Sequence, residues 1–320
     1  MKKHSEISAV LPLHISEKNK SNSCDLADIL FFSLNKYAQR EMFNKFFVVC
    51  PSDQMDILSA YIRKWPEMKL ILVDEEQLVP EFRKYPDVTG WRKQQIIKLA
   101  ISSLMESRFY LTFDADVVCT SPLSEEILLP DNRALLQLQD IDIHRNWWIS
   151  SARYIDINLA DITQGMDVTP AILATDVCRS LMGYLTKDKK SWVEILLAPH
   201  RQHAWQKFLP NFDKRYNWTE YTLYFLYLKK MNSVELYHCI GDTGQVRQRL
   251  FTNHLSVWQS SSFEQWNPEL VFSPEDPGLF CIIQSNKNIP PQVVLKKVEK
   301  YICKAALPAK DLAKCPTQPE

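Results

Sequence analysis

Short β-rich runs alternate with stretches of helical periodicity through the first third of the chain. The predicted order is strand 7–13, helix 25–37, strand 46–50, helix 51–65, strand 69–73, helix 90–105 and strand 109–113. Strands that are separated by helices form βαβ units, which build a largely parallel sheet covered by helices on its faces. The sequence therefore predicts an α/β fold.

The pattern changes in the second half, where tryptophan and tyrosine crowd residues 147–237. A strand is predicted at 134–139, and helices at 175–185 and 218–230. Pro290 and Pro291 interrupt the chain before an amphipathic helix from Gln292 to about Lys304. We interpret the chain as a single domain that ends in this helix, followed by a frayed tail.

The composition excludes several classes of binding site. Lys and Arg together number 38, as do Asp and Glu, so the chain has no overall positive charge with which to hold a nucleic acid. Only six glycines are present, whereas an average content of about 7% would give about 22. The two common glycine-rich phosphate loops are both missing from the sequence.

The sequence also predicts a cytoplasmic protein. The apolar stretch at 7–13 is too short and interrupted for a signal-peptide core, and no run approaches the roughly 20 apolar residues that span a bilayer. Eight cysteines are scattered without a Cys-x-x-Cys pair or zinc-ligand spacing. Most of them lie in apolar runs, as expected of reduced, buried thiols.

Two acidic residues, Asp114 and Asp116, follow the apolar run 109–113. At a strand end, side chains two apart project to one side, and the carboxyl ends of strands are where open α/β sheets bind ligands. Two buried like charges need a cation, and Mg²⁺ or Mn²⁺ typically takes one or two carboxylates together with phosphate oxygens. The alternative is a turn in which one aspartate caps the next element and the other is solvated.

The acidic pair and three other segments resemble a known group. Asp114-Ala115-Asp116 is similar to the D-x-D motif of metal-dependent GT-A glycosyltransferases. Together with 90–99, Thr219-Glu220-Tyr221 and Gln284-Ser285, it resembles a family of bacterial GT-A enzymes of unassigned specificity. The resemblance extends over about residues 7–285. It implies a GT-A-like Rossmann-type mixed sheet flanked by helices.

The resemblance implies a domain at 1–289, in which 1–125 bind the nucleotide sugar and 126–289 shape the acceptor site, and a C-terminal helix and tail at 290–320. It also implies transfer of a sugar from a nucleoside-diphosphate sugar to the hydroxyl of a glycan or lipid-linked acceptor, in bacterial surface polysaccharide synthesis. By resemblance, Asp116 binds Mn²⁺ or Mg²⁺, and Asp114 reaches the metal or the ribose. The metal would neutralise the leaving nucleotide.

Four residues of the helix after Gly90 share one face, namely Trp91, Gln94, Gln95 and Lys98. This face would hold donor phosphate or sugar hydroxyls beside the acidic pair, with Gln95 and Lys98 as the main candidates. Arg92 is an alternative phosphate partner. A solvated surface face is the competing interpretation.

The remaining catalytic and metal-binding roles follow from the resemblance. Glu220, at a predicted helix start, is the candidate general base that would deprotonate the acceptor hydroxyl, although a capping carboxylate has the same pattern. Asp176 is its competitor. His254 is the candidate third metal ligand, with His238 as the alternative.

Aromatic and basic side chains in the second half have two interpretations each. The aromatic residues would stack on sugar rings or fill the core. They are Trp147, Trp148, Trp192, Trp205, Trp218, Tyr221, Trp258 and Trp266. The lysines of the C-terminal helix would allow peripheral contact with an anionic membrane, at the inner face, or would lie in water while the helix packs on the domain.

Two rival functions stay open at this stage. A haloacid-dehalogenase-like phosphatase would use Asp114 as its nucleophile, but its motif belongs to the first strand, and here three βα units precede it. A non-catalytic carbohydrate-binding protein would keep the aromatic platform and lose the metal.

Overall fold

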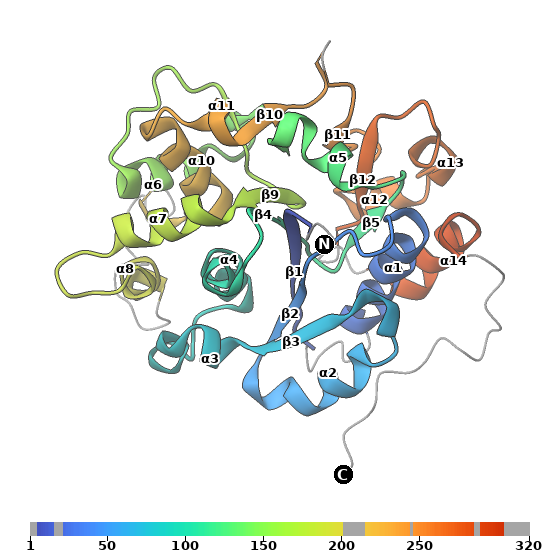
Figure 1. The fold of residues 1–320 in the computed structure, drawn as a ribbon, viewed down its shortest axis with the longest axis horizontal. Helices are drawn as coiled ribbons and strands as arrows, with labels where there is room; N and C mark the ends of the chain where they lie inside the picture. Colours follow the sequence, from blue (N-terminus) through green and yellow to red (C-terminus); the bar gives the residue numbers. More distant parts are fainter. Residues whose placement is uncertain (1–4, 16–21, 201–214, 244–245, 285–288, 304–320) are drawn as a thin grey trace.

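The computed structural model describes residues 5–15, 22–200, 215–243, 246–284 and 289–303. The tail at 304–320, Ser285 and Trp205 lie outside the described residues. Within them, the chain forms one α/β domain (Figure 1).

The core of the domain is a five-stranded mixed sheet with the strand order β3–β2–β1–β4–β9. The first four strands are parallel, and β9 is antiparallel to β4. Their bounds are β1 Ile7–Pro12, β2 Phe46–Cys50, β3 Leu70–Asp74, β4 Phe109–Thr112 and β9 Ala171–Ala174. Every residue of β1, β2, β4 and β9 is buried, as expected of strands that read as continuous apolar runs.

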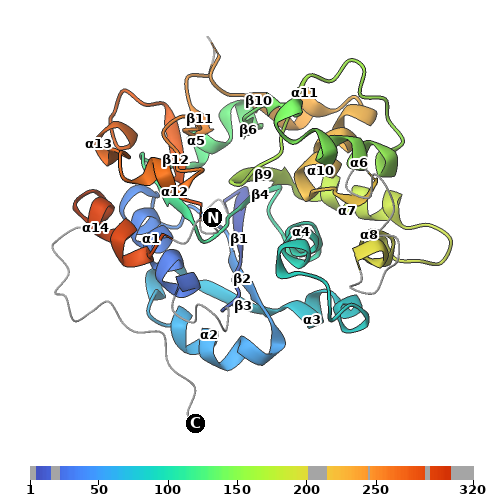
Figure 2. The same ribbon diagram turned by 180° about the vertical axis from the view of Figure 1, so that it is seen from behind.

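Helices cover both faces of the sheet, as Figures 1 and 2 show. One side carries α1 (Asn22–Tyr37) with α14 (Pro291–Ile302) packed beside it. The other carries α4 (Gly90–Ala100), α6 (Arg145–Ile155), α7 (Thr175–Leu185) and α10 (Glu220–Lys230). The predicted α/β architecture of a mixed sheet flanked by helices is therefore confirmed.

Short strands extend the fold beyond the main sheet. β5 (Val117–Cys119) pairs antiparallel with β12 (Gly278–Ile282), which pairs with β11 (Arg249–Phe251). Two further pairs join β6 (Ala134–Leu136) to β10 (His238–Ile240), and β7 (Gln139–Asp140) to β8 (Gln164–Gly165). The first of these small sheets matters most for the site, because it brings residues near 280 next to Asp116.

Most predicted elements are present with adjusted bounds. The strand at 46–50 and the helix at 175–185 match the prediction. The predicted strand at 134–139 is divided between β6 and β7. α2 (Met55–Ile62) and α4 end earlier than predicted, and α6 was not predicted. The other short helices are α3 (Glu75–Leu78), α5 (Glu125–Leu128), α8 (Trp192–Leu197), α11 (Val234–Tyr237), α12 (Ser260–Phe263) and α13 (Pro268–Val271).

The C-terminal helix α14 buries its apolar face inside the domain. Val294, Val298 and Ile302 are buried in a cluster with residues of α1, α12 and β12. The Lys297 ammonium donates hydrogen bonds to backbone carbonyls of the 263–266 segment. The packing alternative thus describes this helix, and membrane contact stays a prediction. Each helix in the described ranges is too short or too polar to cross a bilayer.

Candidate functional site

The acidic pair lies in a turn at the carboxyl edge of the sheet. Strand β4 ends at Thr112, one residue earlier than expected, and Asp114 to Asp116 form a bend before β5. The two aspartates therefore do not owe their common direction to strand alternation, yet both line the same pocket. On its far side the turn is held by β12, because the Ile283 amide donates to the Asp116 carbonyl at 2.9 Å.

This pocket has a volume of about 140 Å³ and is built from segments far apart in the sequence. Residues of α4, the 114–116 turn, the segment before β9, the start of α10 and the end of β12 line it. They are Trp91, Gln94, Gln95, Lys98, Asp114, Asp116, Trp147, Asp167, Val168, Thr169, Thr219, Glu220, Tyr221, Trp258, Ile282 and Gln284. The four residues predicted to share one face of α4 are all among them.

Lys98 joins the acidic groups of the pocket. Its ammonium nitrogen lies 2.8 Å from Asp114 Oδ1, 3.2 Å from Glu220 Oε1 and 2.9 Å from Thr169 Oγ1. A lysine ammonium has three N–H donors, so these three acceptors use all of them. The Lys98 side chain is only 4% exposed, and that of Glu220 only 3%. The geometry therefore favours a role for Lys98 in positioning the carboxylates.

Burial and charge act in opposite directions on this cluster. Burial lowers the pKa of Lys98, but Asp114, Tyr221 and Glu220 together raise this pKa well above its ordinary value. Burial raises the pKa of Glu220, and the Lys98 charge opposes this rise. The Lys98 ammonium therefore compensates for the cost of burying the Glu220 carboxylate at this position.

Glu220 is the first residue of α10, as predicted to within two residues. Thr219 caps the helix, since its hydroxyl accepts from the Thr222 amide while Thr222 bonds back to the Thr219 amide. Arg92 holds the preceding segment: its guanidinium donates to Asn217 Oδ1 at 2.9 Å and to the Trp218 carbonyl. Arg92 does not line the pocket, so it supports the start of α10 from behind.

A further acidic residue, Asp167, also lines the pocket and was not predicted. Its Oδ2 is 3.1 Å from His144 Nδ1. The His144 ring stacks on the indole of Trp147, with centroids 3.9 Å apart and planes 7° apart. Asp167 thus helps to hold the stacked rings of His144 and Trp147 at the pocket. The ring centroid of Trp91 lies 6.1 Å from that of Trp147.

The aromatic residues divide between the pocket and the core. Trp147, Tyr221 and Trp258 line the pocket, together with Trp91, which is 47% exposed. Trp148, Trp218 and Trp266 are buried core residues. Tyr221 also belongs to the polar network, because its hydroxyl is 2.8 Å from both Thr112 Oγ1 and Thr169 Oγ1.

Three other predicted residues lie away from the pocket. Asp176 is the second residue of α7, and because β9 is antiparallel to β4, this helix starts at the edge of the sheet opposite Asp114. The Asp176 carboxylate accepts from the Tyr237 hydroxyl. His254 is exposed in a turn after β11. His238 is buried against the Tyr224 hydroxyl, and burial lowers the pKa of His238 to about 4.

The donor set fits a metal that arrives with its substrate better than a resident metal. In the described ranges, no group of three or more His, Cys, Asp and Glu side chains could hold a metal ion. Asp114 and Asp116 supply two carboxylates. This is sufficient for Mg²⁺ or Mn²⁺ when phosphate oxygens complete the coordination. A third protein ligand, predicted as His254, is not brought to the pair.

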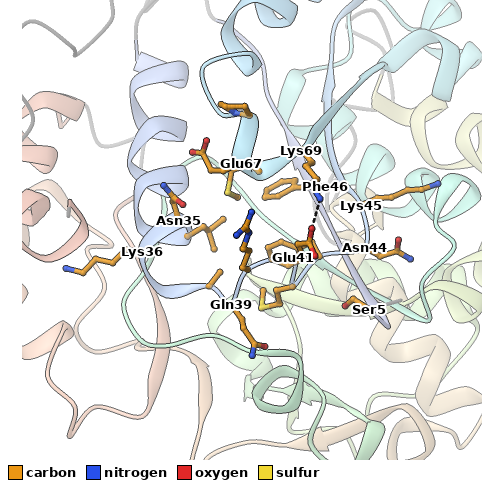
Figure 3. A pocket seen from close by; sticks show the side chains of 17 residues that line it. Ser5, Asn35, Lys36, Gln39, Glu41, Asn44, Lys45, Phe46, Glu67 and Lys69 are labelled. Carbon is orange, nitrogen blue, oxygen red and sulfur yellow. Dashed lines mark hydrogen bonds and ion pairs between the residues drawn. The ribbon is translucent and has the colours of Figure 1, made fainter. Parts of the chain in front are cut away.

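A larger hollow of about 790 Å³ lies at the opposite edge of the sheet, near the amino ends of β1 and β2 (Figure 3). Figure 3 shows Lys69 reaching Glu41 across it, at 2.8 Å. Lys45 pairs with Glu106. None of the predicted site residues lines this hollow, and its lysines are engaged with groups of the protein itself.

Sequence reasoning missed Asp167, Thr169 and His144. Asp167 and Thr169 stand just before the apolar run 171–174, which became β9. Polar residues that flank a buried strand are a usable signal, but the prediction applied it only after the strand at 109–113. His144 has no local signal, because its role depends on its contacts with Asp167 and Trp147.

Comparison with solved structures finds distant similarities. A mouse xyloside xylosyltransferase is 14% identical with a TM-score of 0.48, covering 89% of this chain and 99% of its own. The galactosyltransferase LgtC is 9% identical with a TM-score of 0.47, covering 95% and 98%. An Anaerococcus prevotii 4-diphosphocytidyl-2C-methyl-D-erythritol synthase is 12% identical with a TM-score of 0.32, covering 62% and 84%. These values are too low to assign an activity.

Sequence comparison is more definite about the family than about its chemistry. No curated protein is detectably similar to the chain. A family model described as "Family of unknown function (DUF6492)" matches residues 4–306. The match covers most of the 320 residues, so the chain belongs to this family of unknown function.

Proposed function

We propose that the protein is a metal-dependent glycosyltransferase that moves a sugar from a nucleoside-diphosphate sugar to a hydroxyl acceptor. The observation that carries the proposal is the common pocket of Asp114, Asp116 and Glu220 at the carboxyl edge of the sheet. This edge is where α/β folds of this kind bind ligands. The resemblance of the D-x-D segment to GT-A enzymes points the same way.

The chain's own residues divide the work. Asp114 and Asp116 would hold Mn²⁺ or Mg²⁺, which supplies Lewis-acid stabilisation of the leaving nucleoside diphosphate. Glu220 would accept the proton of the acceptor hydroxyl. Burial, which raises its pKa, makes its carboxylate a better proton acceptor than an exposed one. Lys98 keeps Glu220 and Asp114 in place, and Trp147 and Trp258 offer flat faces for sugar rings.

Isothermal titration of UDP, GDP and CDP, with and without Mn²⁺, tests the donor site. We expect one nucleotide to bind at least tenfold tighter with Mn²⁺, and Asp116→Asn to remove this gain. Asp161→Asn is the matched control, because Asp161 is exposed and does not line the pocket. Equal, weak binding of all three nucleotides with and without metal would refute the donor site.

Turnover assays then separate the functions. With the nucleotide known, Mn²⁺-dependent hydrolysis of its sugar conjugates in the absence of acceptor would support a transferase. Activity on p-nitrophenyl phosphate that depends on Asp114 would instead indicate the phosphatase. Nucleotide-independent glycan binding would indicate the carbohydrate-binding protein. A role in bacterial surface polysaccharide synthesis is part of the proposal, and the acceptors to try first are lipid-linked and capsule-type oligosaccharides.

A further inference from the structure

Two residues that line the pocket each keep one buried polar atom without a hydrogen-bond partner among the residues that the structure describes. They are Gln95, through Nε2, and Asp167, through Oδ1. A buried polar group that stays unsatisfied costs about 1–3 kcal/mol, so such atoms are rare and need an explanation.

The other half of each side chain is anchored on the protein. Gln95 Oε1 accepts from the Arg92 guanidinium at 3.1 Å, and Asp167 Oδ2 contacts His144. Gln95 and Asp167 line the pocket and Arg92 and His144 do not, so the atoms of these two side chains that are still uncommitted are the ones a ligand in the pocket would have to satisfy. The bond from Arg92 also fixes which Gln95 atom is left unpaired, since turning the Gln95 amide over would break this bond.

The two residues belong to segments that a hydrogen bond joins beside the pocket. Gln95 lies one turn before Lys98 on α4, and Lys98 Nζ bonds Thr169, two residues after Asp167. One of the unpaired atoms is a donor and the other is an anionic acceptor. A hydroxyl group suits this combination, because it accepts from an amide N–H and donates to a carboxylate at the same time.

The charge of the pocket narrows the ligand further. Among the described residues that line it are four carboxylates, those of Asp114, Asp116, Asp167 and Glu220, and a single lysine. A bound divalent cation and a diphosphate would cancel each other, so the sugar would still meet net negative charge. A sugar that carries its own carboxylate would be repelled.

We infer that Gln95 and Asp167 form the sugar-recognition element of this pocket, which selects a neutral, hydroxyl-bearing sugar over a sugar acid. The inference rests on the proposed function, because it assigns the sugar end of the same nucleotide-sugar site. Gln95 and Asp167 are specificity residues in it, distinct from the proposed metal ligands Asp114 and Asp116.

The test compares each nucleotide with its sugar conjugates by titration in Mn²⁺. The ligands are UDP, UDP-glucose, UDP-galactose and UDP-glucuronate, or GDP and GDP-mannose if GDP is the nucleotide that binds. We expect the wild type to bind a neutral conjugate about tenfold tighter than the nucleotide alone, which corresponds to about 1.4 kcal/mol. We expect it to bind UDP-glucuronate no tighter than UDP.

Two nearly isosteric variants remove the recognition without touching the nucleotide. Asp167→Asn replaces the acceptor by a donor, and Gln95→Glu replaces the donor by an acceptor while keeping an oxygen for Arg92. Each should abolish the tenfold gain, measured in each variant as the ratio of its affinities for the conjugate and for UDP or GDP alone. The double variant exchanges donor and acceptor, so it should recover part of the gain. Circular dichroism checks that each variant is folded, and Asp161→Asn is the control.

The outcomes separate the two proposals. If no nucleotide binds in the presence of Mn²⁺, the proposed function and this inference both fail. If a nucleotide binds in a metal-dependent way but the gain is equal in the wild type, both single variants and the double variant, only this inference fails. Tighter binding of UDP-glucuronate than of UDP-glucose by the wild type would also overturn it.

Discussion

Replacement of Lys98 by methionine should destabilise the protein through the glutamate that it leaves behind. Methionine has nearly the length of lysine and fills the same space without charge. Lys98 Nζ lies 3.2 Å from Glu220 Oε1, and both side chains are less than 5% exposed. Lys98→Met therefore leaves the buried carboxylate of Glu220 without its cation.

The size of the effect follows from the exposure of the two acids. Breaking a buried ion pair by removing one partner costs about 3–5 kcal/mol. The Asp114 side chain is 37% exposed, so water compensates for much of its loss. We therefore expect Lys98→Met to lower the free energy of unfolding by about 3 kcal/mol. This is a large part of the 5–15 kcal/mol that is usual for the free energy of unfolding of a domain.

The double variant gives the sharper test. Glu220→Gln alone should lower the free energy of unfolding by about 1 kcal/mol, because Lys98 keeps its ion pair with Asp114 and its hydrogen bond to Thr169. Adding Glu220→Gln to Lys98→Met removes the stranded charge, so the double variant should be more stable than Lys98→Met by about 1–2 kcal/mol. Two losses that simply add would make it less stable.

Urea unfolding followed by tryptophan fluorescence measures the four proteins. The matched control is the exposed pair Lys69–Glu41, with the same 2.8 Å separation as Lys98–Asp114 and side chains 71% and 47% exposed. The interaction energy between Lys69 and Glu41, taken from the two single variants and the double variant, should stay below about 1 kcal/mol. The reasoning is refuted if Lys98→Met is as stable as Lys69→Met, or if Glu220→Gln destabilises further in the Lys98→Met background.

Three other predictions test the surroundings of the site. Arg92→Lys should lower the free energy of unfolding in urea by about 2 kcal/mol, because a lysine ammonium cannot reproduce the forked guanidinium that donates to Asn217 and Trp218. The control is Arg63→Lys at an exposed position, which should change the free energy of unfolding very little. Burial raises the pKa of Asp28 from 3.8 to about 6, so between pH 3.8 and pH 6 the folded protein binds one proton more than the unfolded chain and loses stability as the pH rises through about 6. The free energy of unfolding of Asp28→Asn should therefore exceed that of the wild type by about 2–3 kcal/mol at pH 7.5 and by almost nothing at pH 4. Six buried cysteines should react with a thiol reagent only when the protein unfolds, namely Cys24, Cys50, Cys119, Cys178, Cys239 and Cys281. A fast reaction of the native protein at any cysteine other than the half-buried Cys303 and Cys315, which lies outside the described residues, would contradict this.

Elements with a strong local pattern could be predicted from the sequence. The buried strand 46–50 is a continuous apolar run, and the helix 175–185 has an apolar face of regular spacing, so both were predicted with their observed bounds. The acidic pair was found because it follows such a run. By contrast, β5, β10 and β11 have three residues each, too few to show a period.

The rest of the pocket lining depended on contacts that no local pattern contains. Asp167 and Gln95 are 72 positions apart and line the same pocket, where Lys98 bonds Thr169. Asp176 illustrates the reverse error. Its position at a helix start resembles that of Glu220, but the antiparallel direction of β9 sends it to the other edge of the sheet. Strand direction was the missing information in that case.

The scarcity of glycine and the charge of the pocket have a common consequence. Nucleotide-binding folds often hold phosphates with backbone N–H groups of glycine-rich loops, and this chain has neither of those loops and no glycine among the pocket residues. Its one lining lysine already donates to three protein acceptors. Among the described lining residues, a diphosphate that entered alone would meet four carboxylates and no uncommitted lysine or arginine. Metal and diphosphate should therefore bind together, each weakly without the other, and titration of Mn²⁺ without nucleotide should show far weaker binding than titration with it.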